Sequence, residues 1–205
     1  MEHSTGMNAT SDVAFTPAVR EMQSRRGSRR AYENLERRGG FNNAITPELA
    51  AFVAARDSFF LATANADGQP YVQHRGGPKG FLRVIDEHTL GFADYRGNRQ
   101  YITLGNLAEN PRAFIFLVDY REQARIKLWG RARVVDDDPA LVARLMPEGY
   151  AAKPEQAILF TVEAWDANCP QHIPRLYDEA EVAEMAAAYE ARIAALLGRP
   201  DSAAG

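Results

Sequence analysis

Three groups of residues in the sequence could contribute to the binding of an anion. Two combine arginine with glycine or asparagine, namely Arg-Gly-Gly-Pro-Lys at positions 75–79 and Gly-Asn-Arg at 97–99, and the third is Arg125 on a later predicted strand. A phosphate group favours guanidinium donors, the free N–H groups of a helix N-terminus, and glycines that let the backbone approach closely. Glycine and arginine also occur together in ordinary turns with solvated side chains. Composition alone favours this second interpretation.

Short β-rich segments must position these stretches. Runs of apolar, aromatic and β-branched residues predict strands, and they cover residues 59–64, 71–75, 81–85, 89–93, 112–118, 125–135 and 157–164. Asn65–Gly68 is a turn signal between the first two, and Gly76-Gly77-Pro78 should interrupt the second. The spacing predicts an antiparallel meander and not βαβ units.

Helices are expected around this β-rich region. Thr16-Pro17, Thr46-Pro47 and Asp138-Pro139 each pair a capping residue with proline at the first helical position, which predicts three helix starts. Asn98 is expected to cap a short helix over 99–104. Gly105-Asn106 should break that helix before a further turn that ends at Pro111. Residues 178–197 have the apolar spacing of an amphipathic helix. Residues 165–174 are expected to be irregular.

The segment from Val19 to Arg38 is dense in arginine. Gly27-Ser28 should divide it into two helices, with Ser28 capping the second and Glu33 pairing with Arg37 one turn later. The arginines could form a nucleic-acid or phosphate surface, or they could coat a solvated helical arm that packs through Tyr32 and Leu35. No interleaved aromatic residues or binding motif accompany the charge, which favours the second interpretation.

Composition sets further bounds. The chain has 205 residues and a formal net charge of −3, which gives no general attraction to nucleic acid. Its single cysteine, Cys169, excludes an internal disulfide. We expect no secretory signal and no membrane span, and therefore a cytoplasmic protein. The expected organisation is an N-terminal helical arm over 1–45, a β-rich domain over 46–175, and a C-terminal helix and tail over 176–205.

Five segments, in this order along the chain, carry a resemblance to a known family. They are Gly68-Gln-Pro-Tyr-Val-Gln-His-Arg-Gly-Gly77, Tyr95-Arg-Gly-Asn-Arg-Gln100, Gly105-Asn-Leu-Ala-Glu-Asn-Pro-Arg112, Leu128-Trp-Gly-Arg-Ala132 and Trp165-Asp-Ala-Asn-Cys-Pro170. Over about residues 45 to 175 the sequence resembles the pyridoxamine 5′-phosphate oxidase-related, FMN-binding split-barrel proteins. The resemblance implies a mainly β protein with flanking helices, built as a Greek-key antiparallel split barrel of six to seven strands. It also implies a homodimer with two FMN sites between the subunits.

The resemblance also implies which residues contact FMN. Gln73, His74, Arg75 and Gly76 would line the flavin and reach its phosphate, and Ala93, Asp94, Asn98 and Arg99 would follow, with Arg99 as a phosphate clamp. Arg125 would approach the ring from the partner subunit. The family's lysine near Lys79 is displaced here. The oxidase's C-terminal Arg-Leu-His-Asp-Arg run is not reproduced by His172-Ile-Pro-Arg-Leu-Tyr177. The resemblance therefore favours a substrate other than pyridoxamine phosphate.

Several functions remain open at this stage. The first is an FMN-dependent oxidoreductase acting on a small molecule, without nucleic acid or membrane as a partner. The second is a flavin-binding or sensor module without turnover. The third is a haem-handling split barrel with His172 as ligand, because some relatives bind haem. Cys169 and His172 are too few ligands for a zinc site, so we expect no metal.

Overall fold

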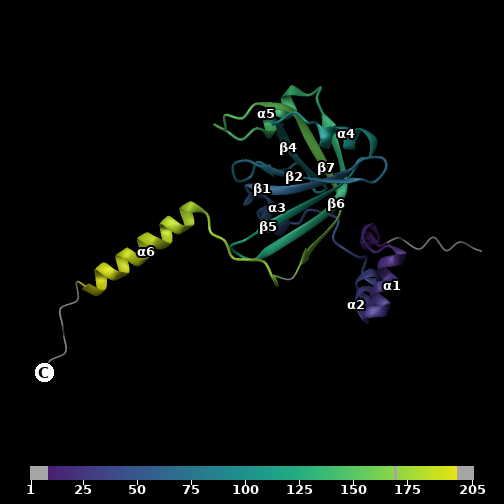
Figure 1. The fold of residues 1–205 in the computed structure, drawn as a ribbon, viewed down its shortest axis with the longest axis horizontal. Helices are drawn as coiled ribbons and strands as arrows, with labels where there is room; N and C mark the ends of the chain where they lie inside the picture. The colour runs from purple at the N-terminus through teal and green to yellow at the C-terminus, as the bar shows by residue number, and fades with distance from the viewer. Residues whose placement is uncertain (1–8, 169, 198–205) are drawn as a thin grey trace, which may run out of the picture. The chain divides into compact units, whose positions relative to one another are not determined.

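The structure is a computed structural model, and it describes residues 9–168 and 170–197. The chain divides into two compact units, one of residues 1–118 and 125–169 and the other of residues 119–124 and 170–205. The first unit holds all the strands and the N-terminal helices (Figure 1).

A single seven-stranded sheet forms the first unit, in the order β2-β1-β5-β6-β7-β4-β3. The strands are β1 (Ser58–Ala64), β2 (Pro70–Gly76), β3 (Arg83–Val84), β4 (Thr89–Tyr95), β5 (Arg112–Asp119), β6 (Ala124–Val135) and β7 (Pro154–Asn168). The registered pairs of β1–β2, β1–β5, β3–β4, β4–β7 and β6–β7 are all antiparallel. The mainly β, antiparallel fold with flanking helices is therefore confirmed.

The first hairpin follows the sequence prediction closely. Ala64 pairs with Pro70 across a turn in which Gly68 has a φ of 83°. The predicted meander is wrong, however, because β2 and β3 follow each other in the chain but lie at opposite ends of the sheet. Gly77 marks the departure from β2. A Cβ at Gly77 would lie 2.8 Å from the Phe81 ring, so the backbone there requires glycine.

Two strands differ in length from the prediction. β3 keeps only two residues, because Phe81 and Leu82 are buried in the core instead of pairing in the sheet. β7 continues past Ala164 to Asn168, through part of the segment that was expected to be irregular, because its pairing with β6 extends to Asn168. On β6, Lys127 lies over the Trp129 ring, and Leu128 between them in the chain is buried.

The sheet encloses an apolar core that two helices cover. Its largest fully buried side chains include Phe59, Phe81, Phe92 and Phe160. α3 (Pro47–Ala54) contributes Leu49 and Val53 to this core. α5 (Pro139–Leu145) packs on β4 and β7 around a smaller cluster. Both helices begin as predicted, with the side chains of Thr46 and Asp138 accepting the capping hydrogen bonds.

The N-terminal arm consists of η1 (Thr10–Val13), α1 (Pro17–Arg26) and α2 (Arg29–Arg37). Thr16 caps α1, and Gly27, with a φ of 81°, separates the two helices as predicted. Two predictions fail here. Ser28 makes no capping hydrogen bond, and Glu33 accepts from Arg29 while Arg37 bonds Asn34. An aromatic series attaches the arm to the sheet, running from Tyr32 through Phe15 and Phe41 to Trp129.

The second unit contains α6 (Glu179–Leu197) and the short loop of residues 119–124. Asp178 and Glu181 form a reciprocal capping box at the start of α6, with bonds of 2.8 and 2.9 Å. Arg121 of the loop pairs with Glu181 at 2.6 Å. The apolar stripe predicted for this helix is present and exposed at Val182, Met185, Tyr189 and Ile193.

Candidate functional site

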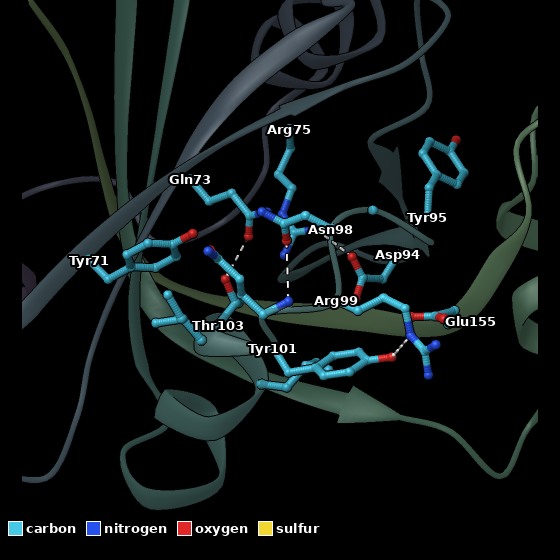
Figure 2. A pocket seen from close by; sticks show the side chains of 14 residues that line it. Tyr71, Gln73, Arg75, Asp94, Tyr95, Asn98, Arg99, Tyr101, Thr103 and Glu155 are labelled. Carbon is cyan, nitrogen blue, oxygen red and sulfur yellow. Dashed lines mark hydrogen bonds and ion pairs between the residues drawn. The ribbon is translucent and has the colours of Figure 1, made fainter.

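A polar pocket lies where β2, the end of β4 and the first turn of α4 (Ile102–Glu109) meet. Its lining residues are Tyr71, Gln73, Arg75, Asp94, Tyr95, Gly97, Asn98, Arg99, Gln100, Tyr101, Ile102, Thr103, Leu104 and Glu155. Figure 2 shows their side chains converging from the strands and from the loop before α4. We call it the β2–α4 pocket. Five of the nine residues predicted to contact a cofactor line it.

Arg75 is the most enclosed cation of the β2–α4 pocket. Its Nη1 forms an ion pair with Oδ1 of Asp94, and the two side chains are only 12% and 10% exposed. The second carboxylate oxygen of Asp94 accepts from Nε2 of Gln156, on β7, at 2.6 Å. Nε of Arg75 is buried and has no hydrogen-bond partner in the protein. A buried donor without a partner is costly, so this site suits a ligand oxygen that completes the guanidinium's contacts.

Two hydrogen bonds attach α4 to the β2–β1 hairpin. The Thr103 hydroxyl donates to Oε1 of Gln73 at 2.8 Å, and Nδ2 of Asn106 donates to the Thr63 hydroxyl at 3.0 Å. Thr103, Asn106 and Thr63 are all buried. The first bond orients the Gln73 amide so that its NH₂ group remains a donor for a ligand.

The loop before α4 has an unusual backbone. Arg99 and Tyr101 have φ values of 61° and 54°, in the left-handed region that few residues other than glycine adopt. α4 therefore starts at Ile102, later than predicted, and Asn98 does not cap it. The helix also continues through Gly105-Asn106, where a break was expected. Asn98 instead accepts from the Gln100 N–H at 3.2 Å.

The first turn of α4 has no side-chain cap, because Tyr101 at the cap position makes no such bond. The first N–H groups of a helix need partners and carry a partial positive charge, so an uncapped turn facing a pocket suits an anion. Arg99 lies beside it. Its Nε donates to the Tyr101 hydroxyl at 2.9 Å, and this bond raises the pKa of Arg99 above its usual range.

The charges of the region favour an anion. Three arginines, Arg75, Arg96 and Arg99, line the β2–α4 pocket or a second pocket that adjoins it. The same two pockets have two carboxylates, those of Asp94 and Glu155. Asp94 pairs with Arg75, whereas Arg96 lies 3.7 Å from Glu155, at the outer limit of an ion pair. The surplus positive charge and the amides of α4 together suit a phosphate.

An adjoining pocket shares Gln73, Arg75, Tyr95 and Gly97 with the first. His74, Gly76 and Ala93 line this second pocket. Eight of the predicted cofactor contacts are thus brought together in two neighbouring pockets: Gln73, His74, Arg75, Gly76, Ala93, Asp94, Asn98 and Arg99. Arg125 is not among them. It lies at the start of β6, opposite Asn168, and its contribution from a partner subunit remains a prediction.

A larger pocket lies between η1 and the outer face of β1, β5, β6 and β7. Its cavity volume is about 630 Å³, against about 50 Å³ for the β2–α4 pocket. Phe114 and Trp129 line it, and its Arg131 is paired with Glu163 at 2.8 Å. It contains none of the predicted cofactor residues. Size alone therefore does not identify the anion site.

Thr103, Glu155 and Gln156 are among the polar residues of the site that sequence reasoning missed. Gln156 lies directly opposite Asp94 in the β4–β7 ladder, 62 positions further along the chain. Only that strand pairing could have indicated it. Thr103 could have been found from α4, because it lies one turn before the buried Leu107.

Cys169 and His172 were the other sequence signals considered as possible ligands. Cys169 lies outside the described residues, and His172 belongs to the second unit. Within residues 9–168 and 170–197, no group of three or more His, Cys, Asp or Glu side chains could hold a metal ion. In the same residues, none of the helices combines the length and apolar character needed to cross a bilayer.

Comparison with known families identifies the fold. Residues 45–169 match the model of the family described as pyridoxamine 5′-phosphate oxidase. This match covers more than half of the chain, so the protein belongs to the pyridoxamine 5′-phosphate oxidase family. The seven-stranded antiparallel sheet is the split barrel of that family. Among curated proteins, no match to the sequence was found.

Several solved structures have a similar fold, and this chain aligns with almost the whole length of each. HupZ of Group A Streptococcus aligns with a TM-score of 0.50 at 18% identity, over 65% of this chain and 99% of that one. A putative pyridoxamine 5′-phosphate oxidase from Lactobacillus delbrueckii aligns with a TM-score of 0.47 at 21% identity, over 61% and 95%. An FMN-binding protein from Syntrophomonas wolfei aligns with a TM-score of 0.46 at 12% identity, over 73% and 97%.

Proposed function

We propose that the protein binds FMN in the β2–α4 pocket and its neighbour, and that it is an FMN-dependent oxidoreductase. One observation carries the proposal. Residues predicted from three sequence segments, at positions 73–76, 93–94 and 98–99, come together beside the uncapped start of α4. Their donors match the needs of a phosphate monoester.

The residues would have distinct parts in holding the cofactor. Arg75 and Arg99 would bind the phosphate together with the first amides of α4. Gln73, oriented by Thr103, would donate to an acceptor of the bound molecule. FMN, when bound, supplies the electron-transfer chemistry, and the protein's contribution is to bind it, orient it and leave one face open to a substrate.

The proposed assembly is a homodimer with the cofactor between its subunits. The outer face of β1 and β2 exposes Phe60 and Val72, which are 36% and 59% exposed, and Phe60 contacts the His74 ring from the facing position. Large exposed apolar groups on neighbouring strands are typical of an interaction surface. His74 also lines the second pocket, so a second copy on this face would border the cofactor.

The first experiment is an absorption spectrum of the purified protein together with the mass of any ligand released by denaturation. A flavin spectrum and the mass of FMN support the proposal. A Soret band that disappears in a His172→Ala variant would replace it with the haem interpretation. A protein that takes up neither added FMN nor haem would contradict both.

A second experiment tests the phosphate contacts. Arg99→Ala should weaken FMN binding by roughly 1.5–3 kcal/mol, because one charge-assisted contact is lost. Arg133→Ala is the matched control, since Arg133 is exposed on β6 and lines neither cofactor pocket. Equal affinity of the two variants would show that Arg99 does not bind the phosphate.

A third experiment tests the dimer. Val72→Arg should shift the protein from dimer to monomer in analytical ultracentrifugation and weaken FMN binding. Val84→Arg, at the opposite end of the sheet and 38% exposed, should change neither. A Val72→Arg variant that stays dimeric would exclude this face as the interface.

Turnover is tested separately from binding. Reduction of bound FMN by a nicotinamide nucleotide under anaerobic conditions, seen as bleaching of the flavin band, would support an enzyme. If neither reduced nicotinamide nucleotide bleaches the bound flavin, the alternative of a flavin-binding or sensor module is favoured.

A further inference from the structure

Asp94 and Gln156 form the immediate support of Arg75. The two residues face each other in the β4–β7 ladder, and Gln156 Nε2 donates to Oδ2 of Asp94 at 2.6 Å. Oδ1 of the same carboxylate accepts from Nη1 of Arg75. Each carboxylate oxygen therefore has its own donor, and the carboxylate is fixed in one orientation.

This arrangement decides where the guanidinium can act. β2 and β4 are not neighbours in the sheet, so Arg75 spans the opening between them to reach Asp94. Nη1 is occupied by the ion pair, while Nε is buried without a protein partner. The edge formed by Nε and Nη2 is therefore the part of the fork left for a ligand.

We infer that Asp94 and Gln156 are positioning residues that act through Arg75 to make the pocket selective for a phosphorylated flavin over the same flavin without phosphate. This inference rests on the proposed function. It adds Gln156, which lines neither cofactor pocket, and it assigns to Asp94 a role that its charge alone does not suggest.

The charge of Asp94 makes the inference testable. If Asp94 were only a negative neighbour of the phosphate, its removal would strengthen binding, because like charges repel. If Asp94 holds Arg75 in place, its removal should weaken binding, because the guanidinium loses its fixed orientation. Asp94→Asn keeps the size of the side chain and separates the two cases, because FMN affinity should rise in the first and fall in the second.

The experiment measures the affinities of FMN and riboflavin for the full-length protein by quenching of flavin fluorescence. Gln156→Leu and Asp94→Asn should each weaken FMN binding by about tenfold, the value of a single charge-assisted hydrogen bond at its lower limit, and leave riboflavin within about twofold. Gln69→Leu, the same change in the exposed β1–β2 turn, should alter neither affinity.

The outcomes separate the inference from the proposed function. A wild-type protein with equal affinity for FMN and riboflavin would contradict the phosphate site itself. If wild type prefers FMN and Arg75→Met loses that preference while Gln156→Leu keeps it, the phosphate site stands and the inference is overturned. Tighter FMN binding by Asp94→Asn, or equal losses for both flavins in Gln156→Leu, would also overturn it. Thermal unfolding of each variant identifies a loss that comes from misfolding.

Discussion

Two regions of the molecule are rich in arginine, and they use it differently. In the N-terminal arm, Arg20 contacts the carboxylates of Asp12 and Glu36, and Arg29 contacts those of Glu33 and Glu36. In the β2–α4 pocket, Arg75 has one carboxylate, and Arg99 donates to the neutral hydroxyl of Tyr101. The arm satisfies these arginines internally, whereas the pocket leaves donors available. An anion site is thus indicated by unsatisfied donors and not by the number of arginines.

The ion pairs of the two regions differ in burial, and this should give the largest difference in the free energy of unfolding between variants. Arg75→Met removes one partner of a buried pair and leaves the Asp94 carboxylate with Gln156 alone, so it should destabilise the protein by about 3–5 kcal/mol. Arg20→Met breaks the pairs with Asp12 and Glu36 through a side chain that is itself 35% exposed, and should cost less, about 1–2 kcal/mol. Urea unfolding measures both. Similar losses would show that burial does not distinguish the regions.

The sequence predicted much of this comparison, but not its polar details. Caps with proline, as at Thr16 and Thr46, depend on adjacent residues and were correctly located. The start of α4 was not, because it depends on the left-handed backbone of Tyr101, a residue type that gives no local sign of it. Eight cofactor candidates were recognised from family motifs, and the fold brings them together.

Contacts between distant segments could not be predicted in the same way. Gln156 was missed because its role arises only from the register of β4 with β7. The meander failed for a similar reason, because the chain between Gly76 and Arg83 crosses to the far end of the sheet instead of forming a hairpin. Strand types follow from local alternation, but strand order depends on which apolar faces close the core.

Glu36 holds the arm together, and its removal should affect the arm without affecting the pocket. Oε1 accepts from Nε and Nη2 of Arg20 at 3.1 and 3.0 Å, and Oε2 accepts from Arg29. Glu36→Gln loses charge-assisted bonds and should destabilise the arm by about 1.5–3 kcal/mol. Hydrogen exchange of the Thr10 amide, which bonds Gly39, reports that opening.

The matched control for this variant is Glu33→Gln. Glu33 makes one exposed contact with Arg29 at a spacing of one turn, and its loss should cost about 0.5 kcal/mol or less. FMN affinity should stay unchanged in both variants. A loss of FMN binding in Glu36→Gln would show that the arm and the pocket are coupled, against the separation described above.

Acid should loosen the arm through the same carboxylate. Burial raises the pKa of Glu36, but hydrogen bonds from Arg29 and Arg20 outweigh it and hold this pKa below the usual range. The unfolded arm therefore binds the proton more tightly than the folded arm. The stabilisation is complete above the ordinary glutamate pKa of about 4.3 and is lost as the pH falls through the lower folded value. The protection factor of the Thr10 amide, measured at a series of pH values, tests this. In Glu36→Gln the protection factor should no longer depend on pH in this range.

The smallest expected difference in stability is between substitutions at two helix starts. Thr16 accepts from the Val19 N–H at 3.3 Å, so Thr16→Ala should destabilise the arm by about 1 kcal/mol. Ser28 makes no such bond, and Ser28→Ala should have almost no effect in the same thermal unfolding assay. A cost for Ser28→Ala equal to that of Thr16→Ala would mean that both hydroxyls cap in solution. The contrast between a capped α1 and an uncapped α4 would then no longer distinguish a structural helix start from one that faces a ligand.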